Sequence, residues 1–323
     1  RYFFSMQKIL CIRFSSIGDI LLTTPIIRVL KAQFPNAEIH IATKASFAHL
    51  WEGNPHVAQV HGYQGNLWEF AAELRKEGFD AVYDLHKNLR SHMLCLLLGK
   101  FPKQINKYTA ARKAFVQTKV NTLPGHLVDR NFASLGLVPD GQGLDYFIPA
   151  AAQVKLADYG IKSPYVLFAI GAAHQTKVLS YPKMIELIDS IDHQVVLIGD
   201  DWDEKIGYRL ATLFPEKVLN LCTKTTIAQS ASLIQQAGMV ITHDSSMMHV
   251  AAALKHPNLF TIWGSTHPGL GFTPYQTAFT AVENTNLACR PCSTQGSNVC
   301  PLGHFSCLNS LDLTVLKGAA QAL

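Results

Sequence analysis

Residues 8–34 begin with the run KILCIR, continue through the turn FSSIGD, and pass into a segment with apolar residues at helical spacing. The same order returns at residues 165–177, where YVLFAIG leads into the loop GAAHQTK. A short apolar run predicts a buried strand, and a segment of helical period after it completes a βα unit. Repeated βα units build a mostly parallel sheet, so the predicted fold class is α/β.

Both halves of the chain continue this alternation. Strands are predicted at 8–13, 38–43, 57–61, 80–85, 165–171, 194–199, 239–242 and 259–263, and helices at 19–34, 67–78, 88–98, 183–192, 203–214, 227–238 and 247–254. Between the two sets, residues 121–125 and 139–143 are rich in turn formers and residues 150–153 form a plain spacer. We therefore expect two doubly wound domains, residues 6–155 and residues 156–323.

Composition excludes several classes of protein. Of the 323 residues, 48% are hydrophobic and 16% charged, which favours a packed core over disorder. The longest apolar runs fall far short of the roughly 20 residues of a spanning helix, so no transmembrane segment is predicted. The net charge of +5 contains no basic block. It therefore argues against nucleic acid and suits an anionic small molecule or an anionic membrane face.

Residues 1–5 precede Met6 and carry one positive charge, with neither an apolar core nor a small-residue cleavage site. They do not have the features of a signal peptide. We therefore take Met6 as the expected natural start and expect a cytoplasmic protein.

The turn between the first strand and the first helix carries a carboxylate. Ser15, Ser16 and Gly18 permit a tight turn, and Asp19 begins the helix, where the helix dipole keeps a carboxylate ionised. An ionised carboxylate beside a ligand site can act as a general base. It can equally be a simple N-cap, and both interpretations stay open. The turn lacks the G-x-G-x-x-G fingerprint of dinucleotide binding.

Two loops in the second half are predicted to bind an anion. Residues 171–177 combine small residues with a mobile positive charge at Lys177, which suits a diphosphate. Residues 242–253 read THDSSMMHVAAA, and the free N–H groups of a helix that begins near Ser245 would form an anion site. His249 lies on the same helix face as Ser245, one turn later. A solvated lysine and a packing histidine are the alternatives.

Seven cysteines cannot form a complete disulfide framework within one chain. Cys11, Cys95 and Cys222 lie in apolar segments and are predicted to be buried thiols. The cysteine loop, residues 289–307, contains the other four: Cys289, Cys292, Cys300 and Cys307. Four cysteines in a reducing compartment suggest a structural zinc, with His304 as a substitute ligand. Because only one short C-x2-C knuckle is present, packed thiols or disulfides formed on oxidation are the alternatives.

In order and spacing these motifs resemble those of the ADP-heptose:lipopolysaccharide heptosyltransferases, glycosyltransferase family 9. IRFSSIGDILLTTP at 12–25 is similar to the family's opening strand, turn and helix, and GAAHQTK to its donor-phosphate loop. DSSMMHVAA at 244–252 resembles the family motif D-[ST]-G-x-x-H, with Ser246 in place of the glycine. WGSTHP at 263–268 resembles the turn [YF]-G-P-T-x-P that follows. The resemblance runs from about residue 8 to residue 274.

The resemblance implies a GT-B fold, in which two Rossmann-like domains face each other across a cleft. The first domain would bind the acceptor and the second the nucleotide-sugar donor. The implied reaction is inverting and requires no cofactor. A heptose or related sugar would pass from an ADP-sugar to the lipopolysaccharide inner core. The implied place is the cytoplasmic face of the inner membrane, with peripheral contact and no nucleic-acid partner.

Site residues follow from matching the family's motifs position by position. Asp19 matches the general base. The implied donor-binding residues are Thr176, Lys177, Asp203, Thr225, Asp244, Ser245, Ser246 and His249, with Glu204 as the alternative to Asp203. The acceptor-binding candidates are Ser16, Gly18, His86 and Arg90, the last two because residues 84–91 follow a strand on the ligand side of the sheet.

Two other functions compete with this interpretation. A GT-B sugar-nucleotide epimerase would place several acidic residues around a UDP-sugar. A zinc-loop module that binds nucleic acid or protein would need a basic, aromatic-rich cysteine loop, whereas residues 289–307 hold one arginine, Arg290, and no lysine. The sequence therefore favours the transferase.

Overall fold

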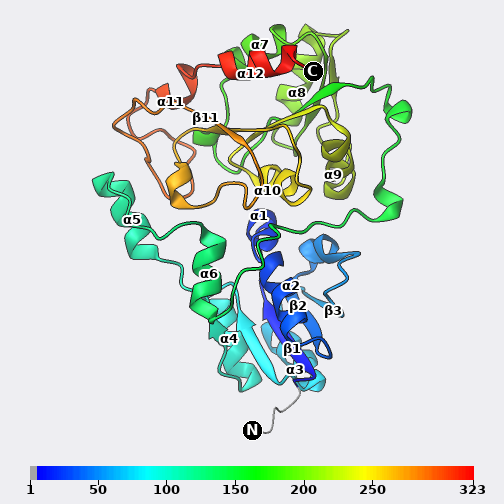
Figure 1. Ribbon diagram of the computed structural model, residues 1–323, viewed down its shortest axis with the longest axis vertical. Coiled ribbons are helices and arrows are strands. Elements are labelled where there is room, and N and C mark those ends of the chain that lie inside the picture. The colour runs from blue at the N-terminus through cyan, green and yellow to red at the C-terminus, as the bar shows by residue number, and fades with distance from the viewer. Residues whose placement is uncertain (1–5) are drawn as a thin grey trace. The chain divides into compact units, whose positions relative to one another are not determined.

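The computed structural model describes residues 6–323 and divides the chain into two compact units (Figure 1). The first unit contains the chain up to Lys107 together with Pro124–Phe147, and the second contains Tyr108–Leu123 and Ile148–Leu323. The last crossing thus falls between Phe147 and Ile148 rather than at residue 155. The residues before Met6, on which the expected natural start depends, lie outside the described residues.

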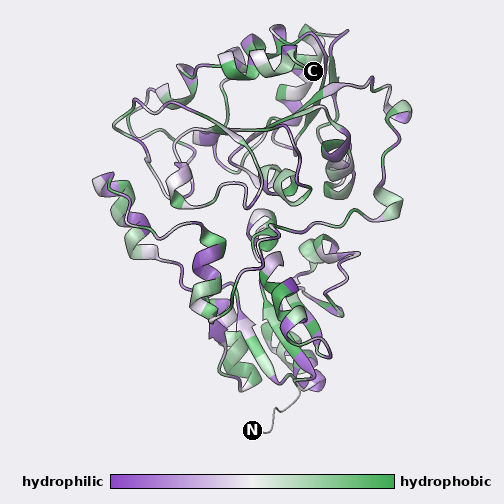
Figure 2. Cartoon of the chain, in the orientation of Figure 1, coloured by the Kyte–Doolittle hydropathy of each residue, from purple (hydrophilic) through white to green (hydrophobic). Residues whose placement is uncertain are grey.

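The first unit is built on a five-stranded parallel sheet in the order β3-β2-β1-β4-β5. Its strands are β1 (Lys8–Ile12), β2 (Glu38–Lys44), β3 (Gln59–Tyr63), β4 (Ala81–Asp84) and β5 (Lys103–Gln104). Ile9 of β1 pairs with Ile39 on one side and with Ala81 on the other. β1 is therefore a central strand, and its side chains from Ile9 to Ile12 are buried on both faces of the sheet, which explains its apolar run. Figure 2 shows hydrophobic residues along these central strands.

The helices of the first unit are α1 (Ile17–Leu21), α2 (Thr24–Gln33), α3 (Leu67–Glu77), α4 (Leu89–Leu98) and α6 (Leu127–Leu135), with a 3₁₀ segment at Ala45–Trp51. The prediction of a single helix at 19–34 is wrong, because the helix is interrupted between Leu21 and Thr24, just before Pro25. Proline has no N–H to donate to the preceding turn. The Thr23 and Thr24 hydroxyls donate to the carbonyls of Ile20 and Leu21 instead.

The second unit is built on a six-stranded parallel sheet in the order β11-β10-β9-β6-β7-β8. Its strands are β6 (Tyr165–Ala169), β7 (Gln194–Ile198), β8 (Val218–Asn220), β9 (Met239–His243), β10 (Leu259–Trp263) and β11 (Thr280–Glu283). Its helices are α5 (Thr109–Thr118), α7 (Tyr181–Asp189), α8 (Glu204–Leu213), α9 (Ile227–Gln236), α10 (Ser246–Ala253), α11 (Ser306–Asn309) and α12 (Thr314–Gln321). Short 3₁₀ turns lie at Ala150–Ala152, Leu156–Tyr159, Gln175–Lys177 and Pro268–Leu270.

Each unit has its own hydrophobic core. In the first, Leu10 and Ile12 of β1 pack with Leu94 of α4. In the second, Phe168 of β6 packs in one cluster with Leu187 of α7 and Leu316 of α12. Across residues 6–323, no helix combines the length and the apolar character needed to cross a bilayer.

Helix α5 comes from the first half of the sequence but belongs to the second unit. Phe115 of α5 and Leu123 pack against Leu270, and the Phe115 ring meets the His267 ring edge to face. The sequence pattern did not predict α5 or α6, because they lie where the strand–helix alternation lapses.

Candidate functional site

Ligands of doubly wound sheets bind at the carboxyl ends of the strands, where the strand order reverses. In the first unit this reversal falls between β1 and β4, and in the second between β6 and β9. Asp19 follows β1 and His86 follows β4, whereas Lys177 follows β6 and Asp244 follows β9. Each unit thus places two of the predicted site residues at its own switch point.

Asp19 is the carboxylate of the first unit's switch point. Its Oδ2 atom accepts hydrogen bonds from the backbone N–H and hydroxyl of Ser16, so Asp19 is the N3 residue of a capping box in which Ser16, and not Asp19, is the N-cap. The Nη2 atom of Arg13 lies 2.8 Å away, and 40% of the Asp19 side chain remains exposed. Desolvation raises the pKa of Asp19, but Arg13 and Ser16 together outweigh it and lower the pKa below its usual range. The Asp19 carboxylate is therefore ionised and accessible. It takes part in the capping box of α1 and also meets the two requirements of a general base.

Arg13 is a site residue that the motif comparison passed over. Besides Asp19, it binds the Ser15 carbonyl through Nε and the Leu85 carbonyl through Nη1. It thereby ties the end of β1 to the end of β4. The available signal in the sequence was an arginine placed directly after a buried strand, between the strand and the turn.

His86 and Arg90 lie at the same end of the first sheet. The His86 ring packs edge to face on Phe14, and the Arg90 guanidinium lies over the rings of Phe14 and Tyr63. Burial lowers the pKa of His86 to about 4, and the positive charge of Arg13 adds to the effect. His86 is therefore neutral near pH 7. A neutral imidazole can donate a hydrogen bond to a sugar hydroxyl and can accept one from it.

The other two acceptor candidates differ in access. Ser16 is exposed beside Asp19, whereas Gly18 is buried within α1. Gly18 therefore shapes the turn and offers no side chain to a ligand. The acceptor roles of Ser16, Gly18, His86 and Arg90 stay predictions.

An ion pair crosses the switch point of the second unit. The Lys177 Nζ atom lies 2.9 Å from Oδ2 of Asp244 and donates to the Asp244 carbonyl at 3.1 Å. The same Oδ2 atom accepts a hydrogen bond of 2.7 Å from the Thr266 hydroxyl. Both side chains are nearly buried, so Asp244 fixes the position of the ammonium group. A pre-positioned cation beside a helix N-terminus is suited to a phosphate.

Thr176, whose donor-binding role stays a prediction, is tied into the protein through its hydroxyl group. Its hydroxyl is buried, donates to the Ser297 carbonyl, and accepts from the Ser265 hydroxyl and the Ser297 N–H. These contacts use the hydroxyl fully, so it joins three loops and its side chain does not offer a further donor. Gly264 permits the arrangement, because a Cβ there would lie 2.2 Å from the Thr176 carbonyl oxygen.

Asp203 lies against two glycines at the ends of β6 and β7. A Cβ on Gly171 would come within 1.9 Å of its carboxylate, and one on Gly199 within 2.6 Å of its Cβ. Desolvation raises the pKa of Asp203 to about 6. Its Oδ2 atom accepts from the Asp200 N–H. A ribose contact fits this position at the strand ends and stays a prediction.

The start of α10 completes this group. Ser245 is the N-cap, and its buried Oγ atom has no hydrogen-bond partner within residues 6–323. Ser246 begins the helix and His249 is buried one turn further on. Thr225 lies apart, at the start of α9, where its hydroxyl contacts the Ser230 hydroxyl. An orphaned hydroxyl at a helix N-terminus fits an anion such as the donor diphosphate.

The cysteine loop braces the donor loop. Arg290 is buried and donates to the carbonyls of Gly264, Thr266 and Asn284, and it pairs with Glu283. Elsewhere in the loop, the Cys292 N–H binds the Ser265 carbonyl. Gly296 lies against the Lys177 side chain. The loop therefore sets the backbone around Lys177 although it follows the recognised motifs.

All seven cysteines are free thiols, and Cys11, Cys95 and Cys222 are buried as predicted. In the cysteine loop, burial raises the pKa of Cys300, but backbone N–H groups from 302–305 outweigh it and lower the pKa. That environment suits a metal ligand. The set as a whole does not fit a formed site, because no three ligand atoms of this loop lie within 4.8 Å of one another.

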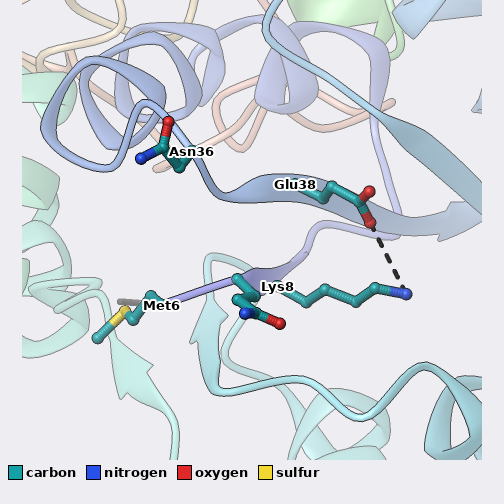
Figure 3. A pocket seen from close by; sticks show the side chains of 5 residues that line it. Met6, Lys8, Asn36 and Glu38 are labelled. Carbon is teal, nitrogen blue, oxygen red and sulfur yellow. Dashed lines mark ion pairs between the residues drawn. The ribbon is translucent and has the colours of Figure 1, made fainter. Parts of the chain in front are cut away.

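Within residues 6–323, one group of three ligand atoms does lie within 4.8 Å: His40, His61 and Glu77. The His40 and His61 nitrogens are 2.9 Å apart, and Lys8 is 2.7 Å from Glu77. The group is thus already satisfied by hydrogen bonds and an ion pair. A pocket at the amino ends of β1 and β2 lies beside Lys8 and Glu38 (Figure 3). It is at the opposite end of the sheet from Asp19, so it is not the switch-point site.

Comparison with known proteins places these features in a family. The family Glycosyltransferase family 9 (heptosyltransferase) matches residues 67–302. A relative, lipopolysaccharide heptosyltransferase 1 of Salmonella typhimurium strain LT2, is 26% identical over 87% of this chain and 96% of its own. The structure of E. coli ADP-heptose lps heptosyltransferase II matches with a TM-score of 0.77 and 22% identity over 98% of both chains. The iron-containing dodecameric glycosyltransferase TibC from enterotoxigenic E. coli H10407 matches with a TM-score of 0.61 and 14% identity, over 98% of this chain and 76% of TibC.

Two parallel α/β units with sites at their switch points define the GT-B class of glycosyltransferases. The chain belongs to glycosyltransferase family 9, the heptosyltransferase family. The family match does not favour an epimerase or a zinc-loop binding module.

Proposed function

We propose that this glycosyltransferase moves a heptose from an ADP-heptose donor to a sugar of the lipopolysaccharide inner core. The observation that carries the proposal is the Lys177–Asp244 pair at the β6/β9 switch point, beside the start of α10. It places a fixed cation and free helix N–H groups where a diphosphate binds in this fold class. The names of the relatives supply the nucleotide and the sugar.

The proposed reaction inverts the anomeric carbon. An acceptor hydroxyl oxygen forms the new bond to that carbon, while the bond from the carbon to the β-phosphate oxygen breaks and ADP leaves. Asp19 takes the proton of the acceptor hydroxyl. Lys177 and the N–H groups at Ser245 and Ser246 stabilise the charge that develops on the diphosphate. His86 and Arg90 bind the acceptor, and Asp203 and Thr225 bind the nucleoside.

The test uses the full chain with ADP-heptose and a heptose-free lipopolysaccharide acceptor. We expect transfer to be detected by mass spectrometry and UDP- or GDP-linked sugars to be poor donors. Lys177→Ala should weaken ADP binding by about 1.5–3 kcal/mol in calorimetry, the range for hydrogen bonds to charged groups. Lys155→Ala, an exposed lysine elsewhere in the second unit, is the matched control. Unchanged ADP affinity in Lys177→Ala would remove this residue from the site.

The reaction proposed here uses no cofactor, and the cysteine loop has a structural role. Zinc–sulfur bonds of about 2.3 Å would require the four sulfurs of the loop to draw together. Elemental analysis decides whether an ion is held, and it separates zinc from the iron of TibC. If either ion is held, a chelator should lower the melting temperature before it affects transfer. If no ion is held, the four thiols should titrate as free under reducing conditions. A chelator that stops transfer at an unchanged melting temperature would place the metal in the reaction.

The proposed place of action is the cytoplasmic face of the inner membrane, where the chain makes peripheral contact. The net charge of +5 suits an anionic membrane face or an anionic small molecule, and the absence of a block of consecutive basic residues gives no support to nucleic acid.

A further inference from the structure

One face of α4 leaves apolar side chains in solvent. Leu89, Met93 and Leu96 are spaced i, i+4 and i+7, so they share one stripe of the helix. They are 81%, 42% and 74% exposed, whereas Leu94 on the opposite face is fully buried in the core. Phe101, three residues beyond the end of α4, is fully exposed. Figure 2 shows α4 as hydrophobic over much of its length.

Leu89, Met93 and Leu96 form a row on one helix, and Phe101 follows that helix closely in the chain. Isolated exposed apolar residues are ordinary, but a row of them on one helix marks an interaction surface. We call the surface made by Leu89, Met93, Leu96 and Phe101 the α4 face.

The same stretch carries the chain's net charge. Residues 85–107 contain five basic residues and no Asp or Glu: Lys87, Arg90, Lys100, Lys103 and Lys107. The rest of the chain holds 23 basic and 23 acidic residues, so the net charge of +5 arises from this segment. Lys100 and Lys103 are exposed and flank Phe101. Positive charge therefore lies on both sides of Phe101 in the chain and in the same segment as the apolar row.

We propose that the α4 face docks on an anionic lipid bilayer. The apolar side chains enter the boundary between headgroups and acyl chains, and the lysines bind lipid phosphates. A second copy of the chain is a poorer occupant, because a two-fold interface would bring the two basic segments against each other. The inference rests on the proposed function in one respect: docking would hold the enzyme where a lipid-linked acceptor lies.

The test is sedimentation of the full chain with vesicles, either phosphatidylethanolamine with phosphatidylglycerol or phosphatidylcholine alone. We expect binding to the anionic vesicles and little binding to the neutral ones. The double variant Leu96→Ser, Phe101→Ser should reduce partition at least tenfold. Lys100→Gln and Lys103→Gln should each reduce it about fivefold, with a stronger effect at low salt. The matched control is Tyr208→Ser on α8, an aromatic residue that is 69% exposed in the second unit and should bind normally.

Three results would overturn the proposal. They are equal binding to both vesicle types, unchanged binding of the Leu96→Ser, Phe101→Ser variant, or a change from dimer to monomer in that variant with vesicle binding retained. The last result would identify a second copy as the occupant. Transfer to a soluble, delipidated acceptor separates this proposal from the proposed function. The variant should transfer normally there, whereas a wild type that binds vesicles but transfers no heptose would count against the function alone.

Discussion

The Asp19 carboxylate combines two requirements that often conflict. Its hydrogen bonds from Ser16 and its pairing with Arg13 keep it ionised, while part of the side chain stays open to solvent. A carboxylate with a lowered pKa is a weak base in solution, so its value to the reaction lies in its position beside the acceptor hydroxyl rather than in its basicity.

Asp19→Asn should lower kcat by about 10²–10⁴-fold, the usual contribution of a positioned base. Stability should change little, because the side-chain oxygen of asparagine still accepts a hydrogen bond from Ser16 in the capping box, and the lost ion pair with Arg13 is partly exposed. The measurement is steady-state transfer together with ADP binding, which should be unaffected. Asp158→Asn, at an exposed aspartate of the second unit, is the control. Near-normal turnover in Asp19→Asn would leave only the capping role.

Asp203 gives the protein a pH dependence of stability. Burial raises its pKa to about 6 in the folded chain, above the value of about 3.9 in an unfolded chain. The folded state therefore binds this proton more tightly. The resulting stability is fully present below about pH 4 and is lost as the pH rises through about 6.

Asp203→Asn cannot ionise and should not show this loss. Between about pH 4 and pH 7, the free energy of unfolding of the wild type should fall relative to the variant by up to about 3 kcal/mol. Urea denaturation of both proteins across this range provides the measurement. Parallel pH profiles would show that Asp203 does not titrate in this window.

At the scale of elements, the donor site depends on loops rather than on strands. The β6/β7 and β9/β10 strand ends provide a platform, and the loop that holds Lys177 is tied to the cysteine loop through Thr176 and Ser297. Arg290 fixes the backbone of residues 264–266 by donating hydrogen bonds to the carbonyls of Gly264 and Thr266. A third hydrogen bond, to the Asn284 carbonyl, holds the guanidinium in place.

Arg290→Ala should lower the free energy of unfolding by about 3 kcal/mol, because it leaves Glu283 and three carbonyls without their partner. ADP affinity should fall as well, since the segment it holds contacts Asp244 and Thr176. Urea denaturation and calorimetry measure the two effects. Arg209→Ala, an exposed arginine that lies over Tyr181, should cost about 1 kcal/mol or less. Equal losses in the two variants would contradict the bracing role.

At the scale of the whole molecule, the chain passes between the units more than once. The segment Tyr108–Leu123 lies within the first half of the sequence and packs into the second unit. The stability of the second unit thus depends on residues far from it in sequence.

Phe115→Ala should destabilise the second unit by about 3–5 kcal/mol, the usual cost of removing a buried phenylalanine ring. Hydrogen exchange followed by mass spectrometry should show faster exchange around Pro268–Leu270 and unchanged exchange in β1 and β4. The matched variant is Phe70→Ala, which removes an equally buried ring from the first unit's core. It should give the reverse pattern. Faster exchange in both units from either variant would mean that they unfold as one.

The sequence by itself determined the α/β class and most strand positions. A strand such as β6 is buried on both faces, and this burial favours a continuous apolar run that the local sequence pattern reveals. The order of the motifs also predicted the family. Their placement after strands predicted Asp19, Lys177 and Asp244 at the ligand end of each sheet, because the carboxyl ends of parallel strands lie on one edge.

Only the tertiary structure decided which of these side chains meet. Lys177 pairs with Asp244 across 67 residues, and the Thr176 hydroxyl is used by Ser297 across 121 residues. It also decided that Arg13 holds Asp19, that α5 joins the second unit, and that no three ligand atoms of the cysteine loop lie within 4.8 Å of one another. The physical reason is that periodicity reports which residues are buried. The partner of a polar group depends instead on how distant segments pack, and that packing leaves no local pattern in the sequence.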